Sequence, residues 1–301
     1  MQIDNQISVR APGTSVGGGV EDDAWVIGDR ISGRSRALLF VHGYNNSQQD
    51  AERAYDTFSG HVFGASATGQ TTFPMFGFFW PGDTHIKIIS TLSYPTRIGP
   101  AKKSAERLFQ YLQTATGPNG GPLELNLVGH SLGCRVILEL LKRFAAARGR
   151  TAVTIGSVVL MAAAVPVSKV EDRKSLGEAA ASPARSLVLH SEGDMVLFLA
   201  FPPGETLAFD AFWPSAVGRH GEPLDVWTTG SPMASAGGQR YGHSDYWKGI
   251  ESSAAAAVAL GVPVQPPLSV HAQPEHELVP PHETPDHDLA GRSLVTASSF
   301  G

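Results

Sequence analysis

Residues 123–144 read LELNLVGHSLGCRVILELLKRF, and their centre is the pentapeptide Gly129-His130-Ser131-Leu132-Gly133. Before the pentapeptide, apolar residues alternate imperfectly with polar ones, which favours a strand. Behind it, apolar residues recur every three or four positions as far as Phe144, which predicts a helix. A serine flanked by glycines between a strand and a helix predicts a sharp, strained turn that exposes the hydroxyl at the carboxyl edge of a sheet. Ser131 is therefore the candidate nucleophile.

Strand and helix patterns alternate on both sides of this stretch. Unbroken apolar runs such as Ala37–Val41 are typical of strands that are buried on both faces of a parallel sheet. The alternation predicts the α/β class, with a mainly parallel central sheet and helices on both faces. The other predicted strands are 76–80, 154–164, 186–189 and 224–227, and the other predicted helices are 48–58, 101–117, 170–181 and 245–260.

The 301-residue chain is predicted to hold one catalytic domain at residues 31–262. Residues 1–30 are polar and rich in glycine, and we interpret them as an N-terminal arm with at most a short strand. Residues 263–301 contain seven prolines and four histidines without an apolar period, which is typical of a solvated, disordered tail. The histidines (His271, His276, His282 and His287) have a spacing that matches no ordered zinc site, and no metal is predicted.

Composition argues against several classes of partner. The formal net charge is -5 and the basic residues are scattered, so no nucleic-acid partner is expected. No run approaches the ~18 apolar residues of a spanning helix, so no integral membrane segment is expected. The single cysteine, Cys134, cannot form an intramolecular disulfide and is predicted to be a small buried filler. With an acidic residue early in the N-terminus, these features predict a cytoplasmic protein.

A serine hydroxyl needs a base within hydrogen-bond reach and an acid that orients the base. Where such a serine lies in a strand–turn–helix setting, the acid follows it in the chain and the histidine comes last. Downstream of Ser131, three histidines precede the predicted tail: His190 ends a strand before the acid region, His220 lies before the last predicted strand, and His243 comes last. His243 follows that strand and is the preferred base. His220 is the alternative.

The candidate acid is Asp194, which follows a short predicted strand in a Gly-Asp turn. A carboxylate at that place can accept the Nδ1–H of an imidazole and stabilise the imidazolium. Glu192 is the rival two residues away. Asp210, within a loop, and Asp225, within a predicted strand, are weaker candidates.

An oxyanion that forms during attack on a carbonyl needs two preorganised N–H donors. The backbone N–H of Leu132, directly after the nucleophile, is one candidate. The backbone N–H of Tyr44, in the loop His42-Gly43-Tyr44-Asn45-Asn46, is the other candidate. The His42-Gly43 sequence is also compatible with an ordinary turn at the end of a strand. The aromatic residues between 198 and 213 are compatible with two roles. They could form an apolar lid or acyl pocket, or they could pack onto the core.

Together, Val41-His42-Gly43-Tyr44-Asn45, the Ser131 pentapeptide, the turn ending at Asp194 and His243 are similar to the esterase/lipase group of α/β-hydrolases. They resemble in particular a bacterial branch of uncharacterised hydrolases whose strand ends in V-H-G-[YF]-N. The resemblance covers residues 36–260. It implies the α/β-hydrolase fold, a Ser-Asp-His triad, no cofactor, and hydrolysis of a small-molecule acyl ester through an acyl-enzyme. A binding member of the same fold without hydrolytic activity, or an interaction protein that works through its tail, is the alternative.

Overall fold

The computed structural model describes residues 3–11, 18–64, 73–82 and 95–263. The predicted tail and its four histidines lie outside these residues, except for Pro263. Among the helices of the described ranges, none combines the length and the apolar character that crossing a bilayer requires.

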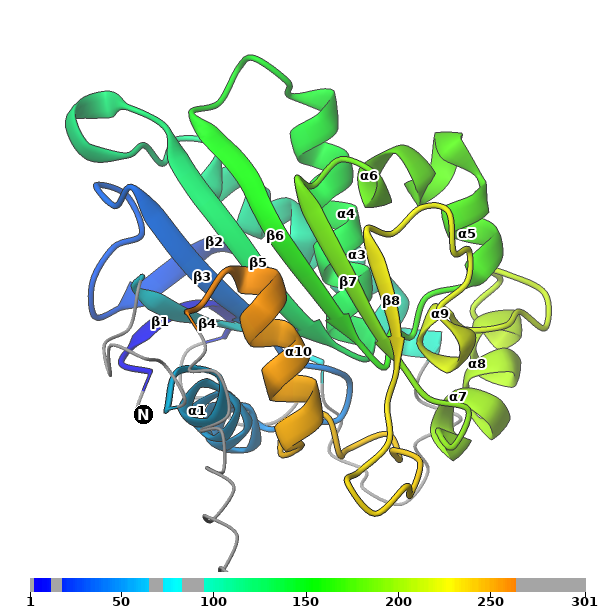
Figure 1. Ribbon diagram of the computed structural model, residues 1–301. Helices are drawn as coiled ribbons and strands as arrows, with labels where there is room; N and C mark the ends of the chain where they lie inside the picture. Colours follow the sequence, from blue (N-terminus) through cyan, green and yellow to red (C-terminus); the bar gives the residue numbers. More distant parts are fainter. Residues whose placement is uncertain (1–2, 12–17, 65–72, 83–94, 264–301) are drawn as a thin grey trace, which may run out of the picture. The chain divides into compact units, whose positions relative to one another are not determined.

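An eight-stranded sheet forms the centre of the described chain, in the order β2-β1-β4-β3-β5-β6-β7-β8 (Figure 1). The β1–β2 pair is antiparallel, and all other neighbouring strands run parallel. The strands are β1 (Asn5–Arg10), β2 (Val20–Ile27), β3 (Arg36–Val41), β4 (Met75–Phe79), β5 (Leu123–His130), β6 (Val153–Met161), β7 (Arg185–His190) and β8 (Thr229–Pro232). The predicted α/β class and mainly parallel sheet are therefore confirmed.

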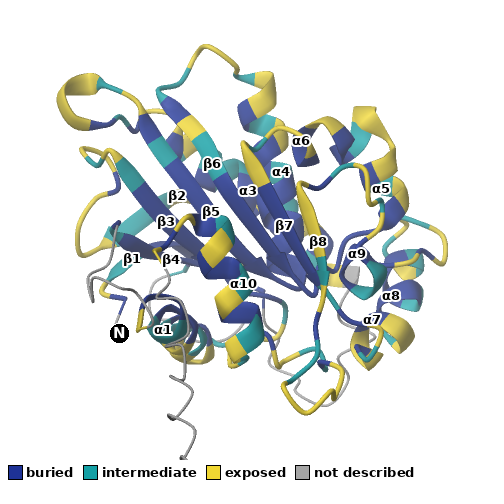
Figure 2. Cartoon of the chain, viewed as in Figure 1, coloured by how far each residue is buried: buried dark blue, intermediate teal, exposed yellow. Residues whose placement is uncertain are grey.

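Helices cover both faces of this sheet. The helices α1 (Gln48–Gly64) and α10 (Ile250–Leu260) lie on one face, and α3 (Pro95–Leu112) and α4 (Leu132–Ala146) lie on the other (Figure 1). Because both faces are covered, the central strands are buried and carry few polar residues, as the dark blue strands of Figure 2 show. The shorter elements are η1 (Pro118–Gly120), α5 (Val167–Glu171), η2 (Arg173–Gly177), α6 (Glu178–Ala180), α7 (Met195–Leu199), α8 (Phe201–Leu207) and α9 (Val217–His220).

The N-terminal residues differ from the arm that the sequence predicts, because they form two strands of the sheet. β1 lies between β2 and β4, and its Ile7 and Val9 side chains are fully buried. The stretch from Gln6 to Arg10 alternates polar and apolar residues as a half-exposed strand does, but the polar Ser8 and Arg10 are buried as well. At the edge, β2 carries three acidic residues in a row, and Asp22 pairs with Arg107 of α3 at 2.8 Å.

Several predicted elements have other bounds, and among the long helices α1 ends later and α3 begins earlier than predicted. Residues 224–227, predicted as the last strand, form a turn, and the last strand is β8. The predicted helix 170–181 is divided among α5, η2 and α6. α10 begins at Ile250, five residues after the predicted start, since the residues before it form two turns: the Asp245 carboxylate accepts the Gly242 N–H at 2.7 Å, and the Asp245 carbonyl accepts the Lys248 N–H at 3.1 Å.

We expect Ile7→Ala to lower the free energy of unfolding by about 2–5 kcal/mol, since it leaves a cavity beneath a fully buried strand residue. Ile27→Ala is the matched control, because Ile27 is 47% exposed, and its effect should stay within about 0.5 kcal/mol. Urea unfolding of both variants measures the difference. Equal effects would mean that residues 5–10 are not part of the core.

Candidate active site

Ser131 lies in the turn between β5 and α4, where its backbone adopts φ 54° and ψ −125°. A positive φ at a residue other than glycine costs on the order of 1–3 kcal/mol and persists only where the surroundings hold it. Here both sides of the residue are held: its N–H donates to Met161 O at 2.9 Å, and its carbonyl accepts the Ala164 N–H at 3.2 Å. The turn thus has the strained geometry that the sequence predicts.

Two glycines let the loop after β3 approach this turn. A Cβ atom on Gly133 would lie 2.4 Å from the carbonyl oxygen of His42, and one on Gly43 would lie 2.8 Å from Cβ of Ser131. Both distances are shorter than any van der Waals contact. Any larger residue would therefore push the two loops apart.

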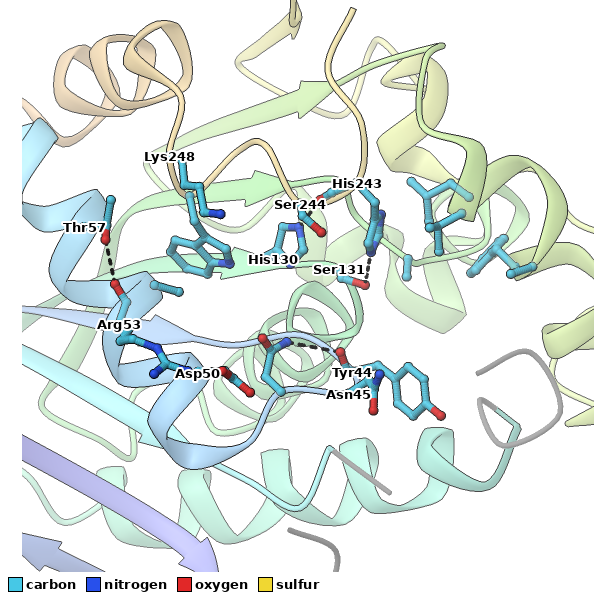
Figure 3. Close-up of a pocket in the computed structure, with 18 residues that line it drawn as sticks. Tyr44, Asn45, Asp50, Arg53, Thr57, His130, Ser131, His243, Ser244 and Lys248 are labelled. Atoms are coloured by element: carbon cyan, nitrogen blue, oxygen red, sulfur yellow. Dashed lines mark hydrogen bonds and ion pairs between the residues drawn. The ribbon is translucent and has the colours of Figure 1, made fainter. Parts of the chain in front are cut away.

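The structure brings the three predicted side chains into one chain of hydrogen bonds, of which Figure 3 shows the one between His243 and Ser131. His243 Nε2 lies 2.8 Å from Ser131 Oγ, and His243 Nδ1 lies 2.7 Å from Asp194 Oδ2. Asp194 is fully buried, and its other carboxylate oxygen caps α7 by accepting the Leu197 N–H at 3.0 Å. This arrangement can move the serine proton to the imidazole while a buried carboxylate stabilises the resulting cation.

The rival candidates lie elsewhere. Glu192 and His220 are 51% and 39% exposed and stand 3.8 Å from each other, and Glu192 also binds Arg240. Asp210 is bound to Arg135 at 2.9 Å, and Asp225 is exposed. His190 ends β7 and is half-buried.

His130 holds the loop that carries His243, a role that the sequence pattern gives no sign of. Its Nε2 lies 2.7 Å from the backbone carbonyl of His243, so this nitrogen carries the proton and donates. Burial, and then the neighbouring His243, lower the pKa of His130 to about 3. The ring therefore stays neutral at ordinary pH and keeps its donor.

Two further polar residues fix the same loop. Ser191 is buried, and its hydroxyl donates to the carbonyl of Tyr241 at 2.7 Å, which ties the acid turn to the histidine loop. Asp245 closes the turn that contains His243. The Ser-Glu-Gly-Asp sequence gives no signal that Ser191 has this partner, because Tyr241 is fifty residues away in the chain.

His42 orients the loop that contains Tyr44. Its Nε2 accepts the Trp80 backbone N–H at 3.2 Å, so Nδ1 carries the proton and donates to the Gly43 carbonyl at 2.9 Å. In a planar trans peptide the C=O and the next N–H point in opposite directions. The Tyr44 N–H therefore points away from the His42 ring, and Tyr44 lines the cavity at Ser131.

The two buried neutral histidines predict that acid destabilises the fold. Burial lowers the pKa of both His42 and His130 from 6.5 to about 3. Between these values the unfolded chain binds protons that the folded chain does not, so the free energy of unfolding falls as the pH drops from about 6.5 towards 3. Each histidine contributes up to about 1.4 kcal/mol per pH unit.

His130→Gln should make this pH dependence shallower by up to about 1.4 kcal/mol per pH unit. Urea unfolding between pH 4 and pH 6 measures the slope. The matched control is His220→Gln, which replaces a histidine whose side chain is 39% exposed. An unaltered slope in His130→Gln would contradict a neutral buried ring.

A cavity of about 760 Å³ opens above Ser131, and its lining differs from one side to the other. The side formed by α7 and α8 is apolar, with Val196, Leu197, Ala200 and Phe201. Arg53, Asp50, Thr57 and Lys248 lie on the opposite side, and Ser131 and His243 stand between the two sides (Figure 3). The predicted aromatic segment thus supplies one wall of the cavity through Phe201, whereas Phe209, Phe212 and Trp213 are exposed.

A family described as "Alpha/beta hydrolase of unknown function (DUF900)" has a sequence model that matches residues 21–201. The matched range begins at the second residue of β2, continues through α7 and includes Tyr44, Ser131 and Asp194, but it ends before His243. No curated protein matches the chain by sequence.

Several solved structures resemble the chain at low identity. The hyperthermophilic esterase from the archaeon Pyrobaculum calidifontis is 13% identical, with a TM-score of 0.40 and coverage of 77% of this chain and 79% of that one. The catalytic core domain of acetyl xylan esterase from Trichoderma reesei is 13% identical, with a TM-score of 0.35 and coverage of 76% and 98%. Alpha/beta hydrolase domain-containing protein 10 from mouse is 14% identical, with a TM-score of 0.35 and coverage of 76% and 90%.

Proposed function

Since this chain belongs to the DUF900 family of alpha/beta hydrolases, we propose that it is a serine hydrolase that cleaves carboxylic esters through an acyl-enzyme. The observation that carries the proposal is the chain of hydrogen bonds from Asp194 through His243 to Ser131. It ends at a hydroxyl that borders a cavity large enough for a small organic ester.

In the proposed reaction, His243 Nε2 takes the proton of Ser131 as Oγ attacks the acyl carbonyl. Asp194 holds the imidazole in the tautomer whose Nε2 can accept, and stabilises the imidazolium that forms. His243 then protonates the leaving alkoxide, and a water molecule deprotonated by the same nitrogen hydrolyses the acyl-enzyme. The fixed geometry supports the proposal, because the base needs no rearrangement to reach the nucleophile.

The backbone N–H groups of Leu132 and Tyr44 are the proposed donors to the oxyanion. Leu132 is the first residue of α4, so its N–H has no partner within the helix and lies at the positive end of the helix dipole. The hydrogen bond from His42 to the Gly43 carbonyl holds the Tyr44 peptide in one orientation. A donor held in place before the reaction stabilises the developing charge at little reorganisation cost.

The apolar wall of the cavity favours an ester with a lipophilic acyl group. Val196, Leu197, Ala200 and Phe201 offer hydrocarbon contacts, which stabilise a bound chain by about 0.8 kcal/mol per buried methylene. Longer acyl chains should therefore bind more tightly until the wall is filled.

A fluorophosphonate probe and a series of p-nitrophenyl acyl esters test the proposal on the full chain. We expect covalent labelling that peptide mapping places on Ser131, and ester turnover that labelling abolishes. Absence of both labelling and turnover would refute the hydrolase proposal, and labelling of a different serine would refute the assignment of the nucleophile.

A further inference from the structure

A second surface feature lies next to the cavity. Of the twelve large apolar side chains that are exposed in the described residues, eight lie between residues 195 and 213. Exposed apolar side chains that gather in one segment of a soluble protein commonly mark an interaction site. Six of them form two groups, one at each end of α8 (Figure 1): Met195, Phe198 and Leu199 of α7, and Phe209, Phe212 and Trp213 of the loop after α8; together we call them the apolar face.

The segment that carries this face presents no charge to solvent. Between residues 195 and 213 the sequence has two charged side chains, Glu205 and Asp210. Glu205 is fully buried, and the Asp210 side chain is 8% exposed. Phe209 and Phe212, by contrast, are 97% and 89% exposed.

The loop is built to hold its aromatic side chains outward. Asp210 binds Arg135 of α4 at 2.9 Å and Lys102 of α3 at 2.7 Å, which ties the loop to two long helices. Phe209 and Trp213 both have a positive φ, and the Trp213 N–H is held by the Thr206 hydroxyl at 2.8 Å. A strained loop persists only where its surroundings fix it, so the exposure of these rings is a feature of the native fold.

The helix α7, which carries one group of the apolar face, also borders the catalytic cavity. Val196 of α7 is 47% exposed and also lines the cavity at Ser131, and its neighbour Leu197 lines it as well. A lipophilic molecule could pass from this face towards Ser131 along hydrocarbon. At the margin, the Arg219 guanidinium lies 4.2 Å from the centre of the Phe198 ring and adds a cation beside the face.

We propose that the apolar face docks on a phospholipid surface. Aromatic side chains favour the boundary between hydrocarbon and water, and the absence of outward charge in segment 195–213 avoids the cost of bringing an ion into the bilayer. Arg219 is placed to meet phosphate headgroups at that boundary. Docking would bring the apolar wall of the cavity to the lipid, so that an ester dissolved there reaches Ser131. The binding itself does not depend on the hydrolase reaction proposed above.

Partition of the full chain onto phosphatidylcholine vesicles tests this proposal. F209S/F212S should lower the partition coefficient roughly tenfold or more, because two rings no longer enter the lipid. L224S/V258S is the matched control: these residues are 70% and 69% exposed at other places of the fold, and binding should stay at the wild-type value. Circular dichroism and urea unfolding check that both variants fold.

Wild-type protein that does not bind vesicles at millimolar lipid, or equal loss in both double variants, would overturn the proposal. A concentration-dependent dimer that F209S/F212S dissociates would overturn it in favour of a second copy of the chain. Turnover of a short, water-soluble ester by the same samples separates the two proposals. We expect F209S/F212S to keep that turnover, and its absence from the wild type would refute the hydrolase alone.

Discussion

Ser131→Ala and His243→Ala should each lower kcat/KM for a p-nitrophenyl ester by about 10⁴- to 10⁶-fold, and the double variant should lose no more than either single variant. The two side chains act as one unit: the imidazole is useful only while it holds the serine proton, and the hydroxyl is a poor nucleophile without it. The hydrogen bond of 2.8 Å between them is the physical basis of this expectation.

His220→Ala is the matched control for this prediction. His220 is also a histidine downstream of the nucleophile, but it faces solvent beside Glu192. Its removal should leave kcat/KM within about twofold of the wild type, as for most surface substitutions. If the losses of Ser131→Ala and His243→Ala multiplied in the double variant, the two residues would act independently and the proposed mechanism would be wrong.

The turn at Ser131 could be predicted because local sequence determines it. The pentapeptide lies between an apolar strand pattern and an amphipathic helix, and both patterns are visible within 22 residues. The family match to residues 21–201 confirms the predicted α/β-hydrolase fold. The roles of Asp194 and His243 stay predictions, although the structure places both at hydrogen-bond distance in the predicted order.

Other parts of the fold and of the candidate site depend on contacts between residues far apart in the chain, which a single sequence does not reveal. Polar and apolar residues alternate in β1 from Gln6 to Arg10, but the sequence does not show that this strand lies inside the sheet, because its partner strand β4 begins sixty-five residues after it ends. In the sequence, His130 is recognisable only as a member of the pentapeptide. The fold shows that its ring contacts the backbone of His243, 113 residues away. Residues 224–227 have the composition of a strand but form a turn, because the neighbouring position beside β7 is taken by residues 229–232.

Asp194→Asn should lower kcat/KM by about 10⁴-fold while leaving the fold intact. An asparagine keeps the oxygen that caps α7, where Oδ1 accepts the Leu197 N–H at 3.0 Å. On the other side it replaces an acceptor with an NH₂ donor, which faces Nδ1 of His243. The imidazole must then adopt the tautomer in which Nδ1 has the free lone pair and Nε2 carries the proton. In that tautomer Nε2 cannot take the proton of Ser131.

Two further variants separate this effect from a loss of structure. Asp194→Ala removes the helix cap as well, so it should lose a similar amount of activity and also about 0.5–2 kcal/mol in the free energy of unfolding. Glu192→Gln changes a carboxylate that is 51% exposed and bound to Arg240, and it should keep near wild-type activity. Steady-state kinetics and urea unfolding on the three variants give both quantities. If Glu192→Gln lost the activity and Asp194→Asn kept it, the orienting acid would be Glu192, and the buried contact at 2.7 Å would serve only to hold the histidine loop.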